Sequence, residues 1–345
     1  MVKHLEPQTK FKYPKVFIVS SGRSGTTLLA SMLNAGEDLY IPYESDFIAR
    51  AYPYFADKCS LSLHDYKLMT QFFQITAKQG GWGMPEDYLY DFLCQRSPQT
   101  FSEVNATICE AFHKREGTED AEWGIKAPVL IASLDRINKV SPTSTIVHIV
   151  RDGRDVYLSY RKVHETSDIK FGPKGILANT LYWIDGLRRV EDFMKHHQHV
   201  PVFELRYENL LAEPDQQLRQ LCEFIGIPYK SEMHEKFNAS DRNQKVAPDQ
   251  FKKSIHKKLH GGLDAKNTNK YLSQMSPYEL FVFEVITAPY LAKYGYDLQY
   301  SWARSILFSP LRMFIYQLAR LFNDWRYAKR DRRMCRLAYE ALENP

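Results

Sequence analysis

A turn near the N-terminus, residues 20–27, has the residue types and the spacing needed to bind a phosphate-like anion. Its sequence is Ser-Ser-Gly-Arg-Ser-Gly-Thr-Thr, and the four apolar residues before it, 16–19, predict a buried strand. A helix is predicted over residues 26–35. The first N–H groups of a helix lack intrahelical partners and carry partial positive charge, so anions bind there. Gly22 and Gly25 are expected to let the backbone close around such an anion.

The side chains of this turn add a fixed cation and several hydroxyl donors. Arg23 supplies the guanidinium group, and Ser24, Thr26 and Thr27 supply the hydroxyls. The turn departs from the G-x-x-x-x-G-K-[ST] pattern, because Ser20 stands at the first glycine and Thr26 at the lysine. Enzymes that transfer or hydrolyse the terminal phosphate of ATP or GTP need that lysine, together with a hydroxyl on magnesium. A P-loop kinase is therefore the disfavoured alternative, and we expect no metal.

Further polar side chains stand where apolar strands end or soon afterwards. They are Arg151 and Ser159 after the strand at 144–150, Lys126 at the end of the strand at 123–126, and Tyr207 after the strand at 200–205. Parallel strands carry their ligands beyond their carboxyl ends, so these side chains should gather near the anion turn. A lysine that ends a buried strand is costly unless an anion meets it. Two alternatives stay open: residues 151–155 as a self-paired charged turn, and Tyr207 as a core residue.

The order of strands and helices predicts an α/β fold, a mainly parallel central sheet with helices on both faces. Tyr40 to Phe47 is predicted as a short extended piece, and residues 63–115 as helices packed over the ligand face. One further helix is predicted to end near residue 140. Four others are predicted at residues 156–163, 176–197, 215–225 and 276–290. Residues 238–270 are predicted to form a basic loop. We divide the chain into a domain at 1–300 and a C-terminal helical extension at 301–345.

Five of these segments, in this order, resemble the sulfotransferases that use 3′-phosphoadenosine 5′-phosphosulfate, over about residues 15–300. The segments are 16–29, 123–126, 149–159, 205–210 and, more loosely, 258–271. The resemblance implies the P-loop-like sulfotransferase fold, with the 5′-phosphosulfate held by the first turn and the donor leaving as adenosine 3′,5′-bisphosphate. It also implies roles for single residues, namely Arg151 and Ser159 on the 3′-phosphate, Tyr207 near the adenine, Lys126 and Arg23 near the sulfuryl group, and Lys270 in a covering loop. Asn269, Lys270 and Tyr271 depart from the family's Gly-Arg-Trp in that loop.

The reaction that the resemblance implies needs a general base, because the acceptor hydroxyl must lose its proton. Glu44 follows Arg23 at the spacing that tyrosylprotein and some bacterial carbohydrate sulfotransferases use for their base. Ser45 and Asp46 replace the Thr-Arg of the tyrosylprotein enzymes, so the acceptor is not carried over. The alternatives are that Glu44 caps a helix, or that Asp46 or His148 is the base. The acceptor is expected to be a hydroxyl-bearing small molecule, glycan or lipid. A non-catalytic nucleotide-binding protein at a membrane is the second rival.

Composition limits the partners and the compartment. The net charge of +5 and the pI near 8.7 suit an anionic ligand or surface and are too weak to indicate nucleic acid. The five cysteines form no C-x-x-C pair, and no apolar run reaches the ~18 residues of a membrane span. We therefore expect a cytoplasmic protein, which could also bind peripherally at the inner membrane surface.

The last 44 residues, 302–345, have a pattern of their own. Apolar residues recur at alternating steps of four and three, at Leu307, Leu311, Phe314, Leu318, Leu321 and Trp325. Basic residues follow at Arg326, Lys329, Arg330, Arg332, Arg333 and Arg336, with Asp331 as the one acid among them. Three interpretations stay open: the apolar stripe packs on the catalytic domain, it forms a dimer, or it docks on an anionic membrane surface.

Overall fold

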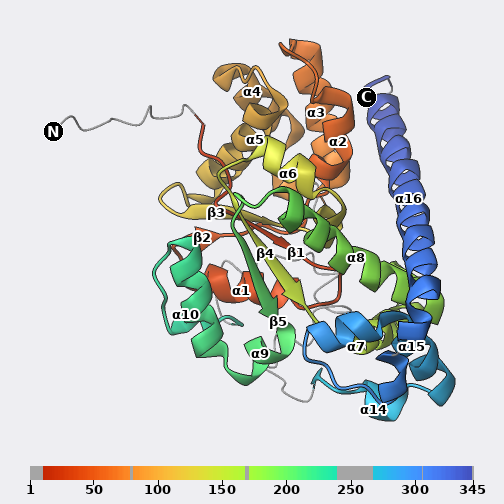
Figure 1. The fold of residues 1–345 in the computed structure, drawn as a ribbon. Coiled ribbons are helices and arrows are strands. Elements are labelled where there is room, and N and C mark those ends of the chain that lie inside the picture. Colours follow the sequence, from red (N-terminus) through yellow and green to blue (C-terminus); the bar gives the residue numbers. More distant parts are fainter. Residues whose placement is uncertain (1–10, 78–80, 168–170, 239–266, 305, 344–345) are drawn as a thin grey trace.

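A parallel β-sheet forms the centre of the molecule (Figure 1). The computed structural model describes residues 11–77, 81–167, 171–238, 267–304 and 306–343. Its strands are β1 (Val16–Val19), β2 (Leu39–Tyr40), β3 (Glu122–Lys126), β4 (Thr145–Val150) and β5 (Val202–Arg206). Their order across the sheet is β2-β3-β1-β4-β5, and every described pairing is parallel. The predicted α/β class is confirmed.

The strand register aligns the ends that the sequence analysis singled out. Ile18 of β1 lies beside Lys126 of β3, and Val19 lies beside His148 of β4. Position 124 in β3 needs glycine, because a Cβ there would lie 2.5 Å from Val16 Cγ1 of the neighbouring strand. The polar residues after β1, β3 and β4 therefore leave the sheet at the same edge.

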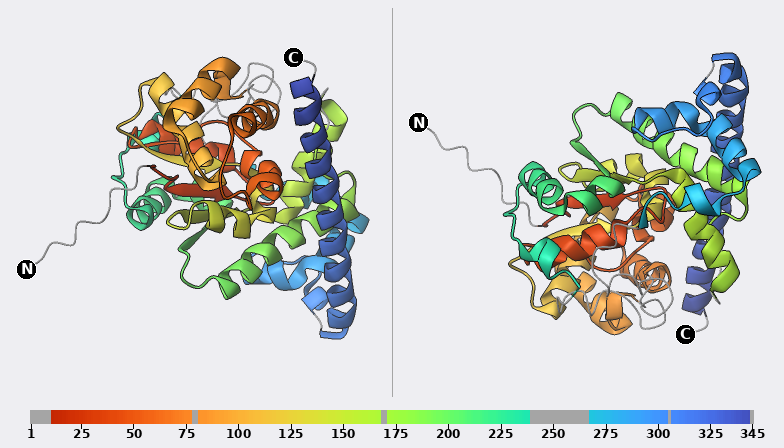
Figure 2. Two further views of the ribbon diagram at one scale, coloured as in Figure 1. Left: turned by 90° about the horizontal axis from the view of Figure 1, so that it is seen from above. Right: turned by 90° about the horizontal axis from the view of Figure 1, so that it is seen from below.

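Helices cover both faces of this sheet (Figure 2). One face packs against α1 (Thr26–Ala35), α9 (Tyr207–Ala212), α10 (Pro214–Ile225) and α11 (Glu232–Glu235). The other face packs against α6 (Leu134–Val140), α7 (Gly153–Thr166) and α8 (Ile176–His196). The helix predicted at residues 156–163 begins three residues earlier, because Asp152 caps it by accepting a hydrogen bond from the Arg154 N–H.

The segment between β2 and β3 is helical, as predicted for residues 63–115, but it begins earlier than expected. It contains α2 (Phe47–Phe55), α3 (Leu63–Thr76), α4 (Glu86–Arg96) and α5 (Phe101–Glu116). The extended piece predicted at residues 40–47 is wrong at its far end, where α2 begins. This helix tolerates Pro53 because the Ala49 carbonyl, which a proline cannot bond, accepts a hydrogen bond from Arg136 instead.

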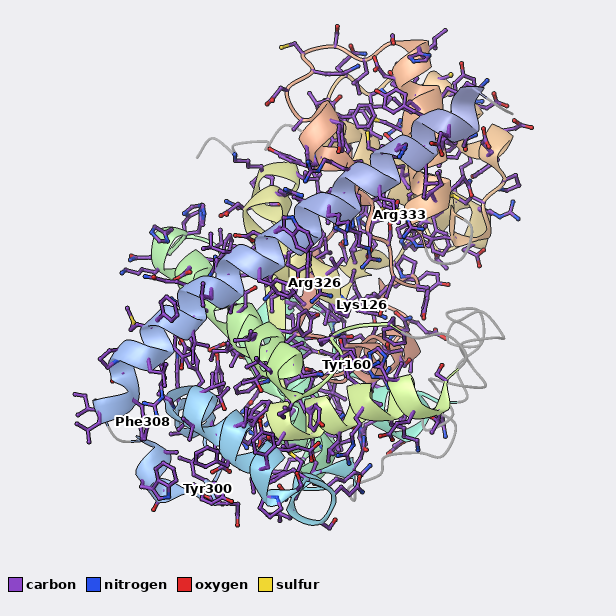
Figure 3. All side chains as sticks on the ribbon, turned by 90° about the vertical axis from the view of Figure 1, so that its right-hand side faces the viewer. Lys126, Tyr160, Tyr300, Phe308, Arg326 and Arg333 are labelled. Atoms are coloured by element: carbon purple, nitrogen blue, oxygen red, sulfur yellow. The ribbon has the colours of Figure 1, made fainter. Side chains whose placement is uncertain are left out.

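A long C-terminal helix, α16 (Ser309–Glu343), crosses the molecule beside α8, α3 and α2 (Figures 1 and 3). It follows α14 (Tyr271–Gln274) and α15 (Pro277–Lys293). Pro289 frees the Val285 carbonyl inside α15, and Arg312 of α16 donates to that oxygen at 2.8 Å. None of the helices described is long and apolar enough to cross a membrane. The division at residue 300 stays a prediction.

The apolar stripe of α16 does not pack on the domain, so the first interpretation of the stripe is wrong. Leu311, Phe314, Leu318, Leu321 and Trp325 keep between 47% and 66% of their surface exposed. The buried residues are instead polar or small, namely Arg312, Tyr316, Ala319, Asn323, Asp331, Cys335 and Ala338. The helix therefore packs on the domain through the face opposite the stripe.

Buried charges hold α16 in this orientation. Asp185 of α8 accepts hydrogen bonds from Arg189 and Asn323, and it pairs with Arg320 at 2.8 Å. Asp331 pairs with Arg50 of α2, which is only 1% exposed. The hydrophobic pattern of α16 does not reveal its inner face, because the partners of that face, Asp185 and Arg50, come from distant parts of the chain.

We expect Asp331→Ala to destabilise the protein by about 3 kcal/mol, because it removes the closest carboxylate from the buried Arg50. The matched control is Asp324→Ala on the same helix, whose side chain is 53% exposed and pairs with Arg189. That change should cost less than ~1 kcal/mol. Urea unfolding of the two variants measures the difference, and equal losses would contradict the role given to Asp331.

Candidate active site

The turn between β1 and α1 has the left-handed backbone that its glycines were predicted to provide. Gly22, Arg23 and Gly25 have φ angles of 76°, 55° and 96°. A Cβ on Gly22 would lie 2.2 Å from the Tyr160 hydroxyl oxygen, and one on Gly25 would lie 2.3 Å from Tyr207 Cδ2. Both positions therefore need glycine for conformation and for space.

The N-terminus of α1 opens from this turn with no side chain capping it. Its N-cap is Gly25, and no acidic residue stands in its first turn. The Ser24 hydroxyl donates to the Gly22 carbonyl at 3.1 Å, and no side-chain hydrogen bond caps α1. Thr26 is buried, and Thr27 is partly exposed. The first N–H groups of α1 are therefore left for an anion or for water.

Lys126 lies at the end of β3 beside this turn, as predicted. Its ammonium group is fully buried and donates to Thr27 Oγ1 at 3.1 Å and to Glu44 Oε1 at 2.9 Å. Burying a charge is costly unless it is paired, and Glu44 provides that pairing. Glu44 does not cap α2, whose N-cap is Asp46. The structure thus brings Thr27, Glu44 and Lys126 together from three separate segments.

Two arginines approach each other on the other side of the turn. Arg151 donates to the Arg23 carbonyl at 3.1 Å and to the Asn267 carbonyl at 2.7 Å, and its guanidinium lies 4.5 Å from the Tyr207 ring centre. Arg23 donates to Ser159 Oγ at 3.0 Å. In the described part of the chain, neither guanidinium forms an ion pair with a carboxylate.

The electrostatics of these two arginines favour an anion. Arg151 is 6% exposed, and its Nε has no hydrogen-bond partner among the described residues. Burial lowers the pKa of Arg23, and the nearby Arg151 acts in the same direction. Neighbouring like charges in a buried site are relieved by a negative charge between them. The predicted residues Arg23, Arg151 and Ser159 therefore form one cationic site.

Tyr207 and Lys270 join this site through a residue that the sequence analysis missed. The Asn267 amide donates to the Tyr207 hydroxyl at 2.7 Å, and Lys270 donates to the Asn267 side-chain oxygen. Tyr207 is 5% exposed and also packs in the core, so its two interpretations are compatible. Residues 239–266, which hold most of the predicted basic loop, lie outside the described residues.

A second missed residue is Tyr160, whose ring approaches the turn at Gly22. Burial raises the pKa of Tyr160 to about 12, so its hydroxyl stays protonated and can donate. It packs against Tyr182 at a ring distance of 6.1 Å. Tyrosines at helical spacing look like core residues in a sequence, and only the close approach to Gly22 reveals this one.

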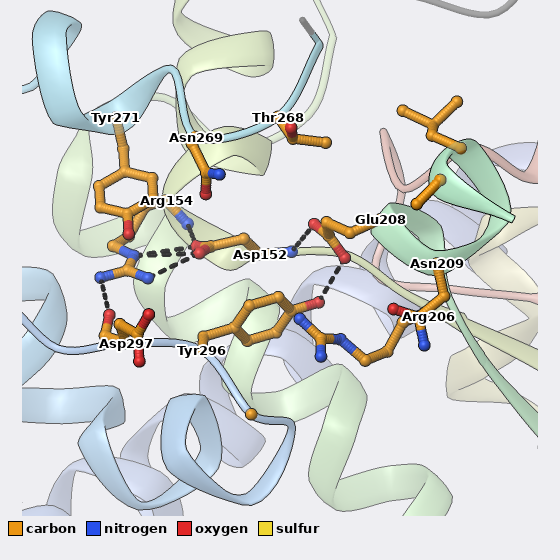
Figure 4. Close-up of a pocket in the computed structure, with 13 residues that line it drawn as sticks. Asp152, Arg154, Arg206, Glu208, Asn209, Thr268, Asn269, Tyr271, Tyr296 and Asp297 are labelled. Atoms are coloured by element: carbon orange, nitrogen blue, oxygen red, sulfur yellow. Dashed lines mark hydrogen bonds and ion pairs between the residues drawn. The ribbon is translucent and has the colours of Figure 1, made fainter. Parts of the chain in front are cut away.

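The charged turn after β4 divides its residues between two roles. Arg154 is fully buried and pairs with Asp152 and with Glu284, at 2.7 and 2.6 Å. It lines a pocket in which Tyr296 donates to Glu208 and Glu208 accepts from the Asp152 N–H (Figure 4). The self-paired interpretation therefore describes Arg154, which braces the turn, and not Arg151.

The runner-up bases lie elsewhere. Asp46 pairs with Arg330 at 3.1 Å and with Arg50 at 3.6 Å, in the cluster that anchors α16. His148 is fully buried in β4 and contacts Glu204 at 3.0 Å. No cluster of three or more metal-binding side chains occurs among the residues described. Glu44 is therefore the candidate base that lies beside the anion turn.

Comparisons with known proteins identify the family and the fold of this chain. A family model described as "Sulfotransferase family" matches residues 14–231, more than half of the chain. A sulfotransferase domain from the curacin biosynthetic pathway matches at 18% identity with a TM-score of 0.56, over 83% of this chain and 99% of that one. The sulfotransferase domain of the Synechococcus PCC 7002 olefin synthase matches at 19% identity and TM-score 0.56, over 85% and 98%. At these identities the two structures establish a shared fold.

A curated relative matches more weakly. An uncharacterized protein of Aquifex aeolicus (strain VF5) is 21% identical over 253 residues, which are 70% of this chain. The match spans only 29% of that relative's length. This relative therefore adds no activity or substrate to what the family model gives.

We expect Gly25→Ala to destabilise the protein more than Gly117→Ala. Both glycines have positive φ, but a Cβ on Gly117 would meet no atom within 4 Å, whereas one on Gly25 would collide with Tyr207. The shared backbone strain should cost ~1–2 kcal/mol, and the collision at Gly25 a further ~1–3 kcal/mol. Chemical unfolding measures both values. Equal costs would mean that Tyr207 moves aside freely.

Proposed function

Since the chain belongs to the sulfotransferase family, we propose that it transfers a sulfuryl group from 3′-phosphoadenosine 5′-phosphosulfate to an acceptor hydroxyl. The observation that carries the choice of donor is the pair Arg23 and Arg151. These two neighbouring arginines have no carboxylate partner in the described part of the chain, and the uncapped start of α1 lies beside them. A donor with phosphate groups at both its 5′ and 3′ positions matches such an elongated cationic site.

The residues of the site fit each chemical group of this donor. The turn at residues 22–27 would hold the 5′-phosphosulfate, and Arg151 would hold the 3′-phosphate with the help of Ser159. Because Ser159 Oγ already accepts from Arg23, its own hydrogen is available to donate. The orphaned Nε of Arg151 is a second donor. Tyr207 and Lys270 would contact the nucleoside.

The donor, when bound, supplies the sulfuryl group and a phosphate leaving group. Glu44 takes up the proton of the acceptor hydroxyl as that oxygen forms its bond to sulfur. Lys126 holds one oxygen of the Glu44 carboxylate and so orients it. Lys126, Arg23 and Thr27 donate to the oxygens that gain negative charge as the bond between sulfur and the bridging oxygen breaks.

The acceptor is a hydroxyl compound on the Glu44 side of the turn, and we propose no narrower class. A small molecule, a glycan or a lipid would each satisfy the chemistry of this site. Transfer of labelled sulfate into a lysate of the source organism, followed by mass spectrometry, would identify the product class. Absence of any labelled product would contradict the proposed activity.

We predict that Arg151→Ala weakens adenosine 3′,5′-bisphosphate binding by roughly 1.5–3 kcal/mol, the value of a charge-assisted hydrogen bond. Isothermal titration calorimetry measures the affinity. Adenosine 5′-phosphosulfate, which lacks the 3′-phosphate, is the control ligand, and its affinity should change little. Equal losses of affinity for the two ligands would contradict the assignment of Arg151 to the 3′-phosphate.

We predict that Glu44→Gln lowers turnover by ~10²-fold or more and leaves bisphosphate affinity unchanged, because the amide keeps the shape but cannot accept the proton. Release of label from the donor in the presence of the lysate acceptors measures turnover. The matched control is Asp46→Asn, which should keep most of the turnover. If Asp46→Asn is the more damaging change, the base is Asp46.

We predict that turnover survives EDTA, because the proposed chemistry uses only side chains and backbone N–H groups of this chain. The measurement is the same release of label, before and after chelation. Loss of turnover on chelation, with recovery on adding magnesium, would favour a P-loop kinase.

A further inference from the structure

We propose that the outer face of α16 docks on a membrane surface that contains anionic lipids. The outer face is the line of residues at steps of three or four along the exposed side of the helix. Its members are Leu311, Phe314, Leu318, Leu321, Trp325, Lys329, Arg332, Arg336 and Tyr339. The proposal concerns a contact surface and does not depend on the reaction.

The N-terminal half of the outer face is apolar and exposed. Leu321 is 66% exposed, Phe314 59% and Trp325 55%, and Phe322 and Met313 beside them are also exposed. Contiguous apolar surface of this kind is rare on monomeric proteins and marks a contact site. Leucine, phenylalanine and tryptophan are the residues that amphipathic helices insert into the lipid boundary.

Aromatic residues continue this surface beyond the start of α16. Trp302 is 49% exposed and lies 5.7 Å from the Phe281 ring, 5.9 Å from Tyr300 and 5.8 Å from Phe308. Figure 3 shows Tyr300 and Phe308 at the N-terminal end of α16. Tryptophan and tyrosine are favoured at the membrane interface, where one end of the ring is apolar and the other meets water.

The C-terminal half of the same face is basic. Lys329 and Arg332 are exposed and form no ion pair with the described residues, while Arg336 pairs with Glu340 at 3.3 Å in an exposed position. Lys329 lies over the Trp325 ring at 5.3 Å, so its stem covers apolar surface and its charge reaches outward. Anionic headgroups complement such a cluster.

The distribution of charge favours a lipid surface over a second copy of this chain. Two α16 helices packed antiparallel would press the basic half of each on the apolar half of the other. Two helices packed parallel would oppose like charges, such as Arg332 and Arg336 with their own copies. A lipid surface accepts both halves at once, with the apolar half inserted and the basic half among the headgroups.

The orientation of the outer face is fixed by the protein itself. Asp185 of α8 and Arg50 of α2 hold the inner face of α16, through Arg320 and Asp331, so docking needs no unfolding. The same anchors make deletion of the helix a poor test, because deletion would remove Asp331, the closest carboxylate to the buried Arg50. Substitutions on the outer face leave the anchors intact and so test the contact alone.

The first experiment is sedimentation of the full-length protein with phosphatidylcholine vesicles, with and without phosphatidylglycerol. We expect sedimentation with the anionic vesicles at low salt, and less at high salt. Phe314→Ser should weaken the binding at least ~tenfold, since an inserted phenylalanine is lost. The matched control is Phe224→Ser, because Phe224 is 45% exposed on α10, on the opposite side of the molecule (Figures 1 and 2). Equal effects of the two changes would overturn the proposal.

The second experiment removes charge. Lys329→Gln should weaken binding to the anionic vesicles about fivefold, which corresponds to ~1 kcal/mol for one basic residue near the surface. The matched control is Lys236→Gln, whose side chain is 66% exposed in the turn after α11, and it should have no effect. Equal losses would mean that overall charge, not this face, causes the binding.

Light scattering, which measures molecular mass in solution, tests whether a second copy of this chain covers the outer face instead. We expect a monomer both for Phe314→Ser and for the unaltered chain. A dimer that Phe314→Ser dissociates would overturn the proposal and assign the outer face to a second copy. Failure of the full-length protein to bind anionic vesicles at low salt would also overturn it. Unfolding midpoints of the serine and glutamine variants, compared with that of the unaltered chain, would show whether each remains folded.

Discussion

Positive charge confined at one edge of a parallel sheet is the constraint on which the rest of the site depends. Arg23, Arg151 and Lys126 are gathered there, and Glu44 is the carboxylate in contact with Lys126. Burying such charges is costly unless each is paired or hydrogen-bonded. The left-handed turn at Gly22 and Gly25 positions Arg23, and Trp183 donates to the Arg151 carbonyl at 3.0 Å. A bound anion would supply the opposite charge that such a site favours.

A neighbouring arginine, Arg154, has a buried charge that acidic partners neutralise. Arg154 follows Arg151 by three residues, yet two carboxylates and the Asp297 carbonyl satisfy it, and it lies 3.6 Å from the Tyr271 ring centre. The pKa of Arg154 is raised, because its acidic partners outweigh the burial, whereas that of Arg23 is lowered. The same residue type thus has a structural role at one position and a binding role at the other. Among the residues that the structure describes, Arg154 forms ion pairs with carboxylates and Arg23 forms none, and this difference separates the two roles.

Sequence patterns predicted the elements that adjacent residues determine. They did not predict contacts between residues far apart in the chain. The β1 strand, its glycine turn and α1 follow from a few adjacent residues, and the alignment of Lys126 with the turn follows from parallel pairing. Asn267 and Tyr160 were missed because their role comes from residues more than fifty positions away. A helix near Asp46 was weighed only as the alternative role for Glu44, and the sequence does not show that Arg136, far along the chain, compensates Pro53 inside α2.

The packing of α16 also depends on long-range contacts, because the helix buries its polar face and exposes its apolar face. Its hydrophobic pattern predicts the apolar face as the buried one, but the polar face is the one that packs on the domain, where Arg320 pairs with Asp185 of α8 and Asp331 pairs with Arg50 of α2. Buried ion pairs contribute little net stability, so their use here fixes orientation more than it stabilises. Tyr327 of α16 adds to the rise in the pKa of Tyr160 and of Tyr182, and the Tyr160 hydroxyl reaches the turn at Gly22. The inner face of α16 therefore lies towards the tyrosines beside the turn, and its outer face is left apolar and basic.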